Sequence, residues 1–179
     1  MTRYVAFLRG IAPLNPNMKN EKLREVCRDL GLESVQTVIS SGNVIFDSDA
    51  PGHAELEDMI EAAWPERLGF TSTTILRTSD QIEDLATSAP FGELTHGPET
   101  YLLVTFSKHP LEVDVELPHR PPDRDYTLVG ATRGELFSVT DTLNSATPDV
   151  MSWIENRFGK AVSSRTWLTV LRVRDRMRG

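Results

Sequence analysis

Short apolar runs and amphipathic stretches alternate in a fixed order over the first 77 residues, and this order restricts the possible folds more than any other feature. Each apolar run has the length of a buried strand, and each amphipathic stretch repeats its apolar residues at helical spacing. The predicted elements are a strand at 4–8, a helix at 19–30, strands at 35–39 and 44–46, a helix at 53–64 and a strand at 73–77. This is the order of the split β-α-β arrangement that is called ferredoxin-like.

Turn and capping residues place the boundaries of these elements. The turn Ser40-Ser41-Gly42-Asn43 separates the second and third strands, because Gly and Asn adopt the positive φ that tight turns require. Pro65 is expected to end or kink the second helix, because the residue before a proline avoids the helical conformation. Thr78 and Gln81 match a capping box, which predicts a third helix from Thr78.

The second half of the chain repeats this plan with a reduced first helix. Its predicted elements are strands at 101–106, 126–129 and 135–139, a helix from Thr147 and Pro148 to Gly159, a strand at 161–163 and a terminal helix. Val113, Val115 and Leu117 alternate with acidic residues, which predicts an additional edge strand. The expected fold is α+β with two tandem ferredoxin-like modules. The expected parts are module 1 at 1–77, a linker helix and connection at 78–98, module 2 at 99–163 and a basic C-terminal helix at 164–179.

The charge of the chain is unevenly distributed. Its 19 Lys and Arg residues and 26 Asp and Glu residues give a net charge of −7, which opposes non-specific binding to nucleic acid. Residues 157–179, in contrast, contain seven basic residues and a single acidic one, Asp175. We interpret this basic segment as a solvated helix face that pairs with the acidic body.

Few residues suit metal, disulfide or covalent chemistry. Cys27 is the single cysteine and lies on the buried stripe of the helix at 19–30, so we interpret it as a packing residue. The four histidines are dispersed, and no metal and no cofactor is predicted. The chain shows no signal-peptide pattern and no apolar run of membrane-spanning length, so we expect a cytoplasmic protein without membrane contact.

Three segments carry a resemblance to a known family. They are Phe7-Leu8-Arg9-Gly10-Ile11, the segment 39–46 around Ser41-Gly42-Asn43, and the segment 163–170 around Arg165 and Trp167. Together they resemble the signatures of the domain of unknown function 1697 family. The resemblance implies a soluble protein of bacterial type with two ferredoxin-like modules, and it implies no activity.

The chain departs from the pattern of that family at two places. Residues 12–16 replace the asparagine and the glycine pair that usually follow the first motif, and Thr166 and Leu168 replace two asparagines of the closing motif. If those residues bind a ligand in the family, this chain has altered or lost that binding.

Polar residues at strand ends and turns indicate a candidate ligand site. Arg9 follows the first strand and Arg165 precedes the terminal helix, and guanidinium groups bind carboxylates and phosphates through paired hydrogen bonds. The turn at 40–43 adds hydroxyl, amide and backbone N–H groups that suit an anion. The candidate ligand-binding residues are Arg9, Ser40, Ser41, Asn43, Arg165 and Thr169, with Trp167 and Cys27 as structural anchors. We predict that they bind a small anionic molecule, a phosphate or carboxylate, at a groove between the modules.

Other interpretations of these residues stay open. Arg9 and Arg165 could pair with acidic groups while Ser41 and Asn43 only shape the turn. RNA-binding modules share the element order, but they need aromatic residues on the third strand, where Asn43–Asp47 holds a single one, so nucleic acid is disfavoured. A protein-interaction module is the third alternative. The sequence assigns no reaction, and it is compatible with a monomer or a small homo-oligomer.

Overall fold

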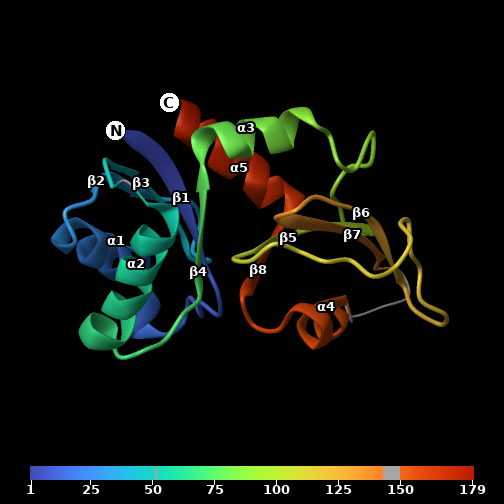
Figure 1. The fold of residues 1–179 in the computed structure, drawn as a ribbon, viewed down its shortest axis with the longest axis horizontal. Coiled ribbons are helices and arrows are strands. Elements are labelled where there is room, and N and C mark those ends of the chain that lie inside the picture. The colour runs from blue at the N-terminus through green and yellow to red at the C-terminus, as the bar shows by residue number, and fades with distance from the viewer. Residues whose placement is uncertain (51, 143–149) are drawn as a thin grey trace. The chain divides into compact units, whose positions relative to one another are not determined.

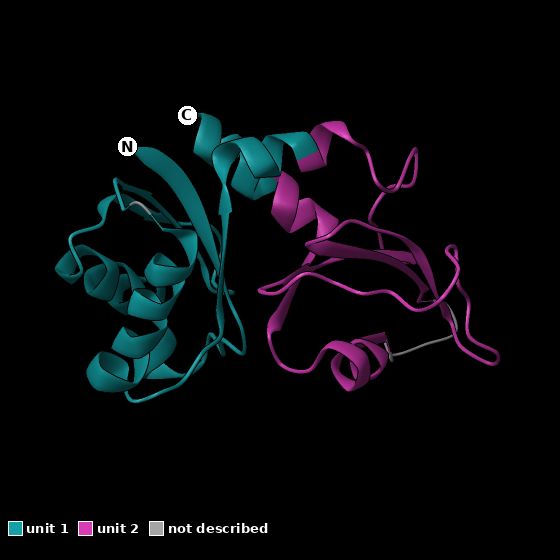
Figure 2. Cartoon of the chain, viewed as in Figure 1, with its two compact units in different colours: residues 1–84, 172–179 teal, residues 85–171 magenta. Residues whose placement is uncertain are grey.

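The structure, a computed structural model, describes residues 1–50, 52–142 and 150–179. Over these residues the chain is α+β, with two four-stranded antiparallel sheets and five α-helices. It divides into two compact units, shown in different colours in Figure 2. Unit 1 comprises residues 1–84 and 172–179, and unit 2 comprises residues 85–171.

The sheet of unit 1 is built around its first strand. Its strands are β1 (Thr2–Leu8), β2 (Glu33–Thr37), β3 (Asn43–Ser48) and β4 (Thr74–Thr78), in the spatial order β2-β3-β1-β4. The helices α1 (Asn20–Asp29) and α2 (His53–Leu68) cover one face of this sheet, and the 3-10 turn η1 (Pro16–Met18) precedes α1 (Figure 1). Tyr4, Ala6 and Leu8 alternate along β1 and enter the core beneath the two helices, as the period of a strand requires.

Two glutamates of α2 protect the outer edge of this sheet, where β4 has no further strand as a neighbour. Glu57 accepts a hydrogen bond from the backbone N–H of Leu76 at 2.8 Å, and Glu61 accepts one from that of Thr74 at 2.6 Å. Glu57 is buried. The two carboxylates therefore satisfy edge N–H groups that would otherwise lack a partner.

The prediction of an end at Pro65 was wrong, since α2 continues through Pro65 to Leu68 and is followed by Gly69 with φ +74°. Trp64, directly before the proline, is fully buried. Its indole N–H donates to the Thr74 hydroxyl at 3.0 Å, and its ring stacks on Phe70. These contacts offset the loss of one backbone hydrogen bond at the proline.

The capping box at the start of α3 (Ser79–Thr87) is confirmed. The backbone N–H of Thr78 donates to the Gln81 side chain at 2.9 Å, and the backbone N–H of Gln81 donates to the Thr78 hydroxyl at 3.2 Å. The two side chains satisfy donors that the first turn of a helix leaves without partners.

Unit 2 contains the second sheet. Its strands are β5 (Thr100–Ser107), β6 (Tyr126–Ala131), β7 (Glu135–Asp141) and β8 (Val162–Thr166), in the order β6-β7-β5-β8. The hairpin of β6 and β7 and the termination of α4 (Val150–Phe158) at Gly159 are confirmed. The cap predicted at Thr147 and Pro148 lies outside the described residues. The terminal helix α5 (Trp167–Arg178) follows β8 directly.

The connection between β5 and β6, residues 108–125, contains no helix and no strand. The edge strand predicted around Val113, Val115 and Leu117 was therefore wrong. The side-chain alternation was correct, because these residues and Leu111 are partly buried against the core of unit 2. Only His119 forms an isolated bridge, with Leu128 of β6. The apolar side chains are thus buried without a continuous ladder of backbone hydrogen bonds.

Burial makes Cys27 chemically inert in the folded protein. Its side chain is fully buried in the core of unit 1, and this desolvation raises the pKa of its thiol to about 12. Because the thiolate is the nucleophile, we expect no reaction with Ellman's reagent at pH 8 in the native state. Since the folded pKa exceeds the unfolded value of about 8.5, this group should also reduce stability as the pH rises above that value.

The measurement is the absorbance of the released thiolate with and without guanidinium chloride. One thiol for each chain should react after unfolding. Rapid reaction of the native protein would contradict the burial of Cys27 in the core.

Candidate functional site

Unit 1 carries a hollow of about 560 Å³ between the end of β2 and the last two turns of α5. The hollow is lined by Gln36, Thr37, Val38, Ile39, Arg172, Asp175, Arg176 and Gly179. A volume of this size is in the range of small-molecule sites, about 300–1,000 Å³. The hollow combines cationic side chains from the helix with apolar residues from the segment that follows the strand.

Arg172 and Arg176 are the cationic groups of the hollow. They are four residues apart on α5, so their side chains project from the same face of the helix. Both are exposed. Among the described residues, neither side chain takes part in a hydrogen bond or an ion pair, whereas the neighbouring arginines do. The hollow therefore presents two guanidinium forks whose donors are available to a ligand.

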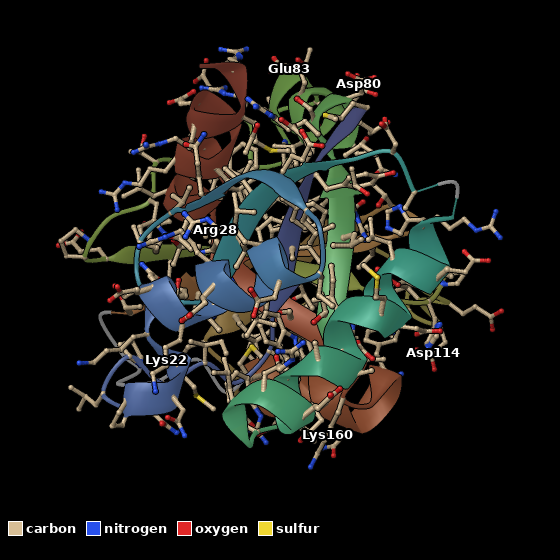
Figure 3. The ribbon with its side chains drawn as sticks, turned by 90° about the vertical axis from the view of Figure 1, so that its left-hand side faces the viewer. Lys22, Arg28, Asp80, Glu83, Asp114 and Lys160 are labelled. Carbon is tan, nitrogen blue, oxygen red and sulfur yellow. The ribbon has the colours of Figure 1, made fainter. Side chains whose placement is uncertain are left out.

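The remaining charges of this region are already paired. Asp175, the acidic residue of the hollow, accepts hydrogen bonds from Nε and Nη2 of Arg174 at 2.9 and 2.7 Å. Arg178 pairs with Glu83, which Figure 3 labels on α3. In addition, Arg24 of α1 donates to the Thr37 hydroxyl at 2.7 Å, which brings a third guanidinium to the wall of the hollow. The paired Asp175 thus opposes an incoming anion less than a free carboxylate would.

The wall of the hollow that follows β2 contains a residue with a strained backbone, Ile39. Ile39 has a φ of +49°, a conformation that is unfavourable for a β-branched side chain, and 39% of its surface is exposed. Three hydrogen bonds fix it: the backbone N–H of Val38 donates to the Asn43 carbonyl at 3.0 Å, the Asn43 amide donates to the Val38 carbonyl at 2.9 Å, and the Asn20 amide donates to the Ile39 carbonyl at 2.9 Å.

Gly42 attaches this turn to the centre of the sheet. Its carbonyl accepts a hydrogen bond from the backbone N–H of Leu8 at 2.9 Å, and its φ is +76°. A Cβ atom at this position would lie 2.5 Å from Cγ1 of Ile11, so glycine is required by space as well as by conformation. The two motifs, 7–11 and 39–46, therefore lie side by side in unit 1.

The structure also locates the candidates that the sequence selected in unit 1. Arg9 follows β1 and is half-buried, its backbone N–H donates to the Thr73 carbonyl, and its carbonyl accepts from the Ser72 hydroxyl. Ser40 is exposed. Asn43 is fully buried, and its amide also donates to the Ser41 hydroxyl at 3.0 Å. The bond between Leu8 and Gly42 brings Arg9 and Ser41 to the same end of the sheet.

Arg165 and Thr169 belong to unit 2 and are buried. Nη1 of Arg165 donates to the Ser163 hydroxyl at 2.9 Å and to the Ser164 carbonyl at 2.8 Å, and burial lowers its pKa to about 10. The Thr169 hydroxyl lies 2.9 Å from that of Thr166. The guanidinium is still charged at neutral pH.

Arg77 of unit 1 has a matching environment that the sequence analysis missed. It is also 8% exposed, and its Nη1 donates to the carbonyl of the preceding residue, Leu76, at 2.7 Å. Each arginine is followed by a threonine, Thr78 or Thr166, whose hydroxyl accepts from the backbone N–H three residues later. The two units thus share an arginine-threonine junction between strand and helix.

The two residues predicted as structural anchors, Cys27 and Trp167, both pack against other side chains. Cys27 is in the core of unit 1. Trp167 is half-buried and meets Phe91 edge-to-face at a centroid distance of 5.5 Å, and Phe91 in turn meets Phe137 at 5.9 Å. The indole therefore packs within unit 2.

The basic C-terminal segment is visible in the sequence, but Arg172 and Arg176 were not predicted as a site. Their spacing of four residues was the available signal. Two of the four α5 arginines pair with carboxylates of the described residues and two do not, and this difference depends on the positions of Glu83 and Asp175 in the fold. Across the described residues, no group of three or more His, Cys, Asp or Glu side chains gathers to hold a metal.

Comparison with known proteins places the chain in a family. Residues 1–137 match the protein of unknown function family DUF1697, and the chain therefore belongs to it. The wall at 36–39 lies inside the matched region, whereas Arg172 and Arg176 lie beyond it.

A conserved bacterial protein from Streptococcus pneumoniae is similar in structure, with a TM-score of 0.74 and 20% sequence identity over 100% of this chain and 99% of that chain. This likeness shows the fold. No curated protein matches the sequence. None of the described helices has the length and apolar character to cross a membrane.

The strain at Ile39 can be measured. Ile39→Gly removes the unfavourable positive φ of a residue with a Cβ atom, whereas Ile39→Ala removes the same side-chain contacts and keeps the strain. We expect the glycine variant to be more stable than the alanine variant by about 1 kcal/mol in chemical unfolding. A glycine variant that is equally stable or less stable would show that the positive φ costs nothing.

Proposed function

We propose that the protein binds a small anionic ligand in the hollow, through a phosphate or carboxylate group that contacts Arg172 and Arg176. The observation that carries this proposal is the pair of guanidinium groups without protein partners among the described residues, in a volume of about 560 Å³. Guanidinium forks bind carboxylates and phosphates with two parallel hydrogen bonds each.

The electrostatics of the whole chain support this position. The protein carries a net charge of −7, so its overall charge opposes the approach of anions, and Arg172 and Arg176 form a local cationic exception. Arginines near the end of a helix also stabilise that helix by interacting with its dipole. The helix dipole can account for the four arginines of α5. It does not account for the hollow or for the apolar wall beside Arg172 and Arg176.

Nucleic-acid binding has less support. The aromatic residue of β3, Phe46, is fully buried beneath the helices and stacks on Tyr4 at a centroid distance of 5.7 Å, so it offers no surface to a base. Asp47, next to it, binds Arg3 through Nε at 2.9 Å and Nη2 at 3.1 Å. A protein-interaction role has no observation of its own in its favour.

We also propose that the two units are tandem ferredoxin-like modules. The strand orders β2-β3-β1-β4 and β6-β7-β5-β8 support this assignment, because each sheet places its first and third strands at the centre. The arginine-threonine junction that both units share gives it further support. In this arrangement the second module lacks the helix between its first two strands.

The test is the rise in thermal midpoint that inorganic phosphate produces, compared with sodium chloride at the same ionic strength. We expect a rise for the natural chain, because a ligand that binds only the folded state stabilises it. The double variant Arg172→Ala and Arg176→Ala should lose the rise. Arg178→Ala removes one arginine of the same helix outside the hollow and should keep it. A rise that survives in the double variant would overturn the proposal.

Arg9 with Ser40 and Ser41 is a second position proposed for the ligand, since the bond between Leu8 and Gly42 brings these residues together. If phosphate binds in the hollow, Arg9→Ala should keep the phosphate-induced rise in thermal midpoint. Loss of the rise in Arg9→Ala, together with its retention in the Arg172 and Arg176 double variant, would move the site to the end of β1. The ligand contacts predicted for Arg165 and Thr169 stay predictions, and Arg165→Ala belongs in the same series.

A further inference from the structure

Ile39 has a strained backbone and an exposed side chain, and neither property stabilises the fold. Its backbone is in a strained conformation at φ +49°. Because 39% of its surface is exposed, burial of its side chain contributes less to stability than burial of a core residue does. A glycine would adopt the same backbone without strain. Strained residues cluster at ligand-binding sites, and Ile39 lines the hollow.

The conformation of Ile39 is fixed from both sides of the residue. The Asn43 side chain and backbone bind Val38 on one side, and the Asn20 amide binds the Ile39 carbonyl on the other. Asn43 is fully buried, so its bonds are shielded from water. The backbone of Val38 and Ile39 is therefore already in place before a ligand arrives, which lowers the ordering cost of binding.

The two walls of the hollow differ in chemistry. Arg172 and Arg176 provide positive charge on α5, and Val38 and Ile39 provide apolar surface after β2. We infer that the ligand is an organic anion, with a phosphate or carboxylate on the arginines and an apolar body on Ile39. This inference rests on the proposed function for the charged group and adds the identity of the rest of the molecule.

Asn20 is a positioning residue in this account, because it acts on the ligand through Ile39. It is half-buried, and its amide reaches across from the start of α1 to the turn. Asn17, three residues earlier, accepts a hydrogen bond from Lys22 and does not contact the turn through any described bond of its side chain, which makes it a matched control.

The experiment compares the dissociation constants of phenyl phosphate and inorganic phosphate for the full chain by isothermal titration. We expect phenyl phosphate to bind about tenfold more tightly, which corresponds to roughly 55 Å² of buried apolar surface. Ile39→Gly should reduce this preference to about twofold or less. Asn20→Ala should reduce the preference in the same direction, and Asn17→Ala should retain it.

The outcomes separate this inference from the proposed function. If the natural chain binds both compounds equally and the Arg172 and Arg176 double variant binds neither, the anion site holds and the apolar body is wrong. A preference for phenyl phosphate that survives in Ile39→Gly also overturns the role of Ile39. If neither compound binds the natural chain, the proposed function fails, and this inference fails with it.

Discussion

The pairing of Asn43 with Val38 is the interaction on which the candidate site depends. A single residue closes the turn twice, through its backbone carbonyl and its side-chain amide, and both bonds are sheltered from water. Gly42 ties the same turn to β1. Because the turn cannot relax, Ile39 keeps a conformation that it would not adopt in a free chain. The apolar wall of the hollow is the direct consequence.

The second half of the site depends on how α5 distributes its charges. Arginines occupy every second position from Arg172 to Arg178, and within the described part of the chain carboxylates pair with Arg174 and Arg178 but not with the other two. The side chains of Glu83 and Asp175 are thereby neutralised, so the two arginines in the hollow face little competition for an anion. An acidic protein can in this way retain a locally cationic site.

Local signals in the sequence were sufficient for much of the fold. The capping box of Thr78 and Gln81 and the hairpin of β6 and β7 depend on neighbouring residues, and both were predicted. Pro65 failed as a helix terminator because distant contacts of Trp64 outweigh its local preference. The turn at 40–43 was recognised. The hollow was not, because its walls, 36–39 and 172–179, are far apart in the chain and meet only in the folded unit.

The most direct measurement is a titration of the isotopically labelled protein with phenyl phosphate, followed by backbone amide NMR shifts. We expect the largest changes on residues 36–39 and on the last two turns of α5, and we expect them to saturate together at one dissociation constant. Changes centred on Arg9 or Arg165, or no saturable change at all, would contradict a binding site formed by the wall of Ile39 and the arginines that face it.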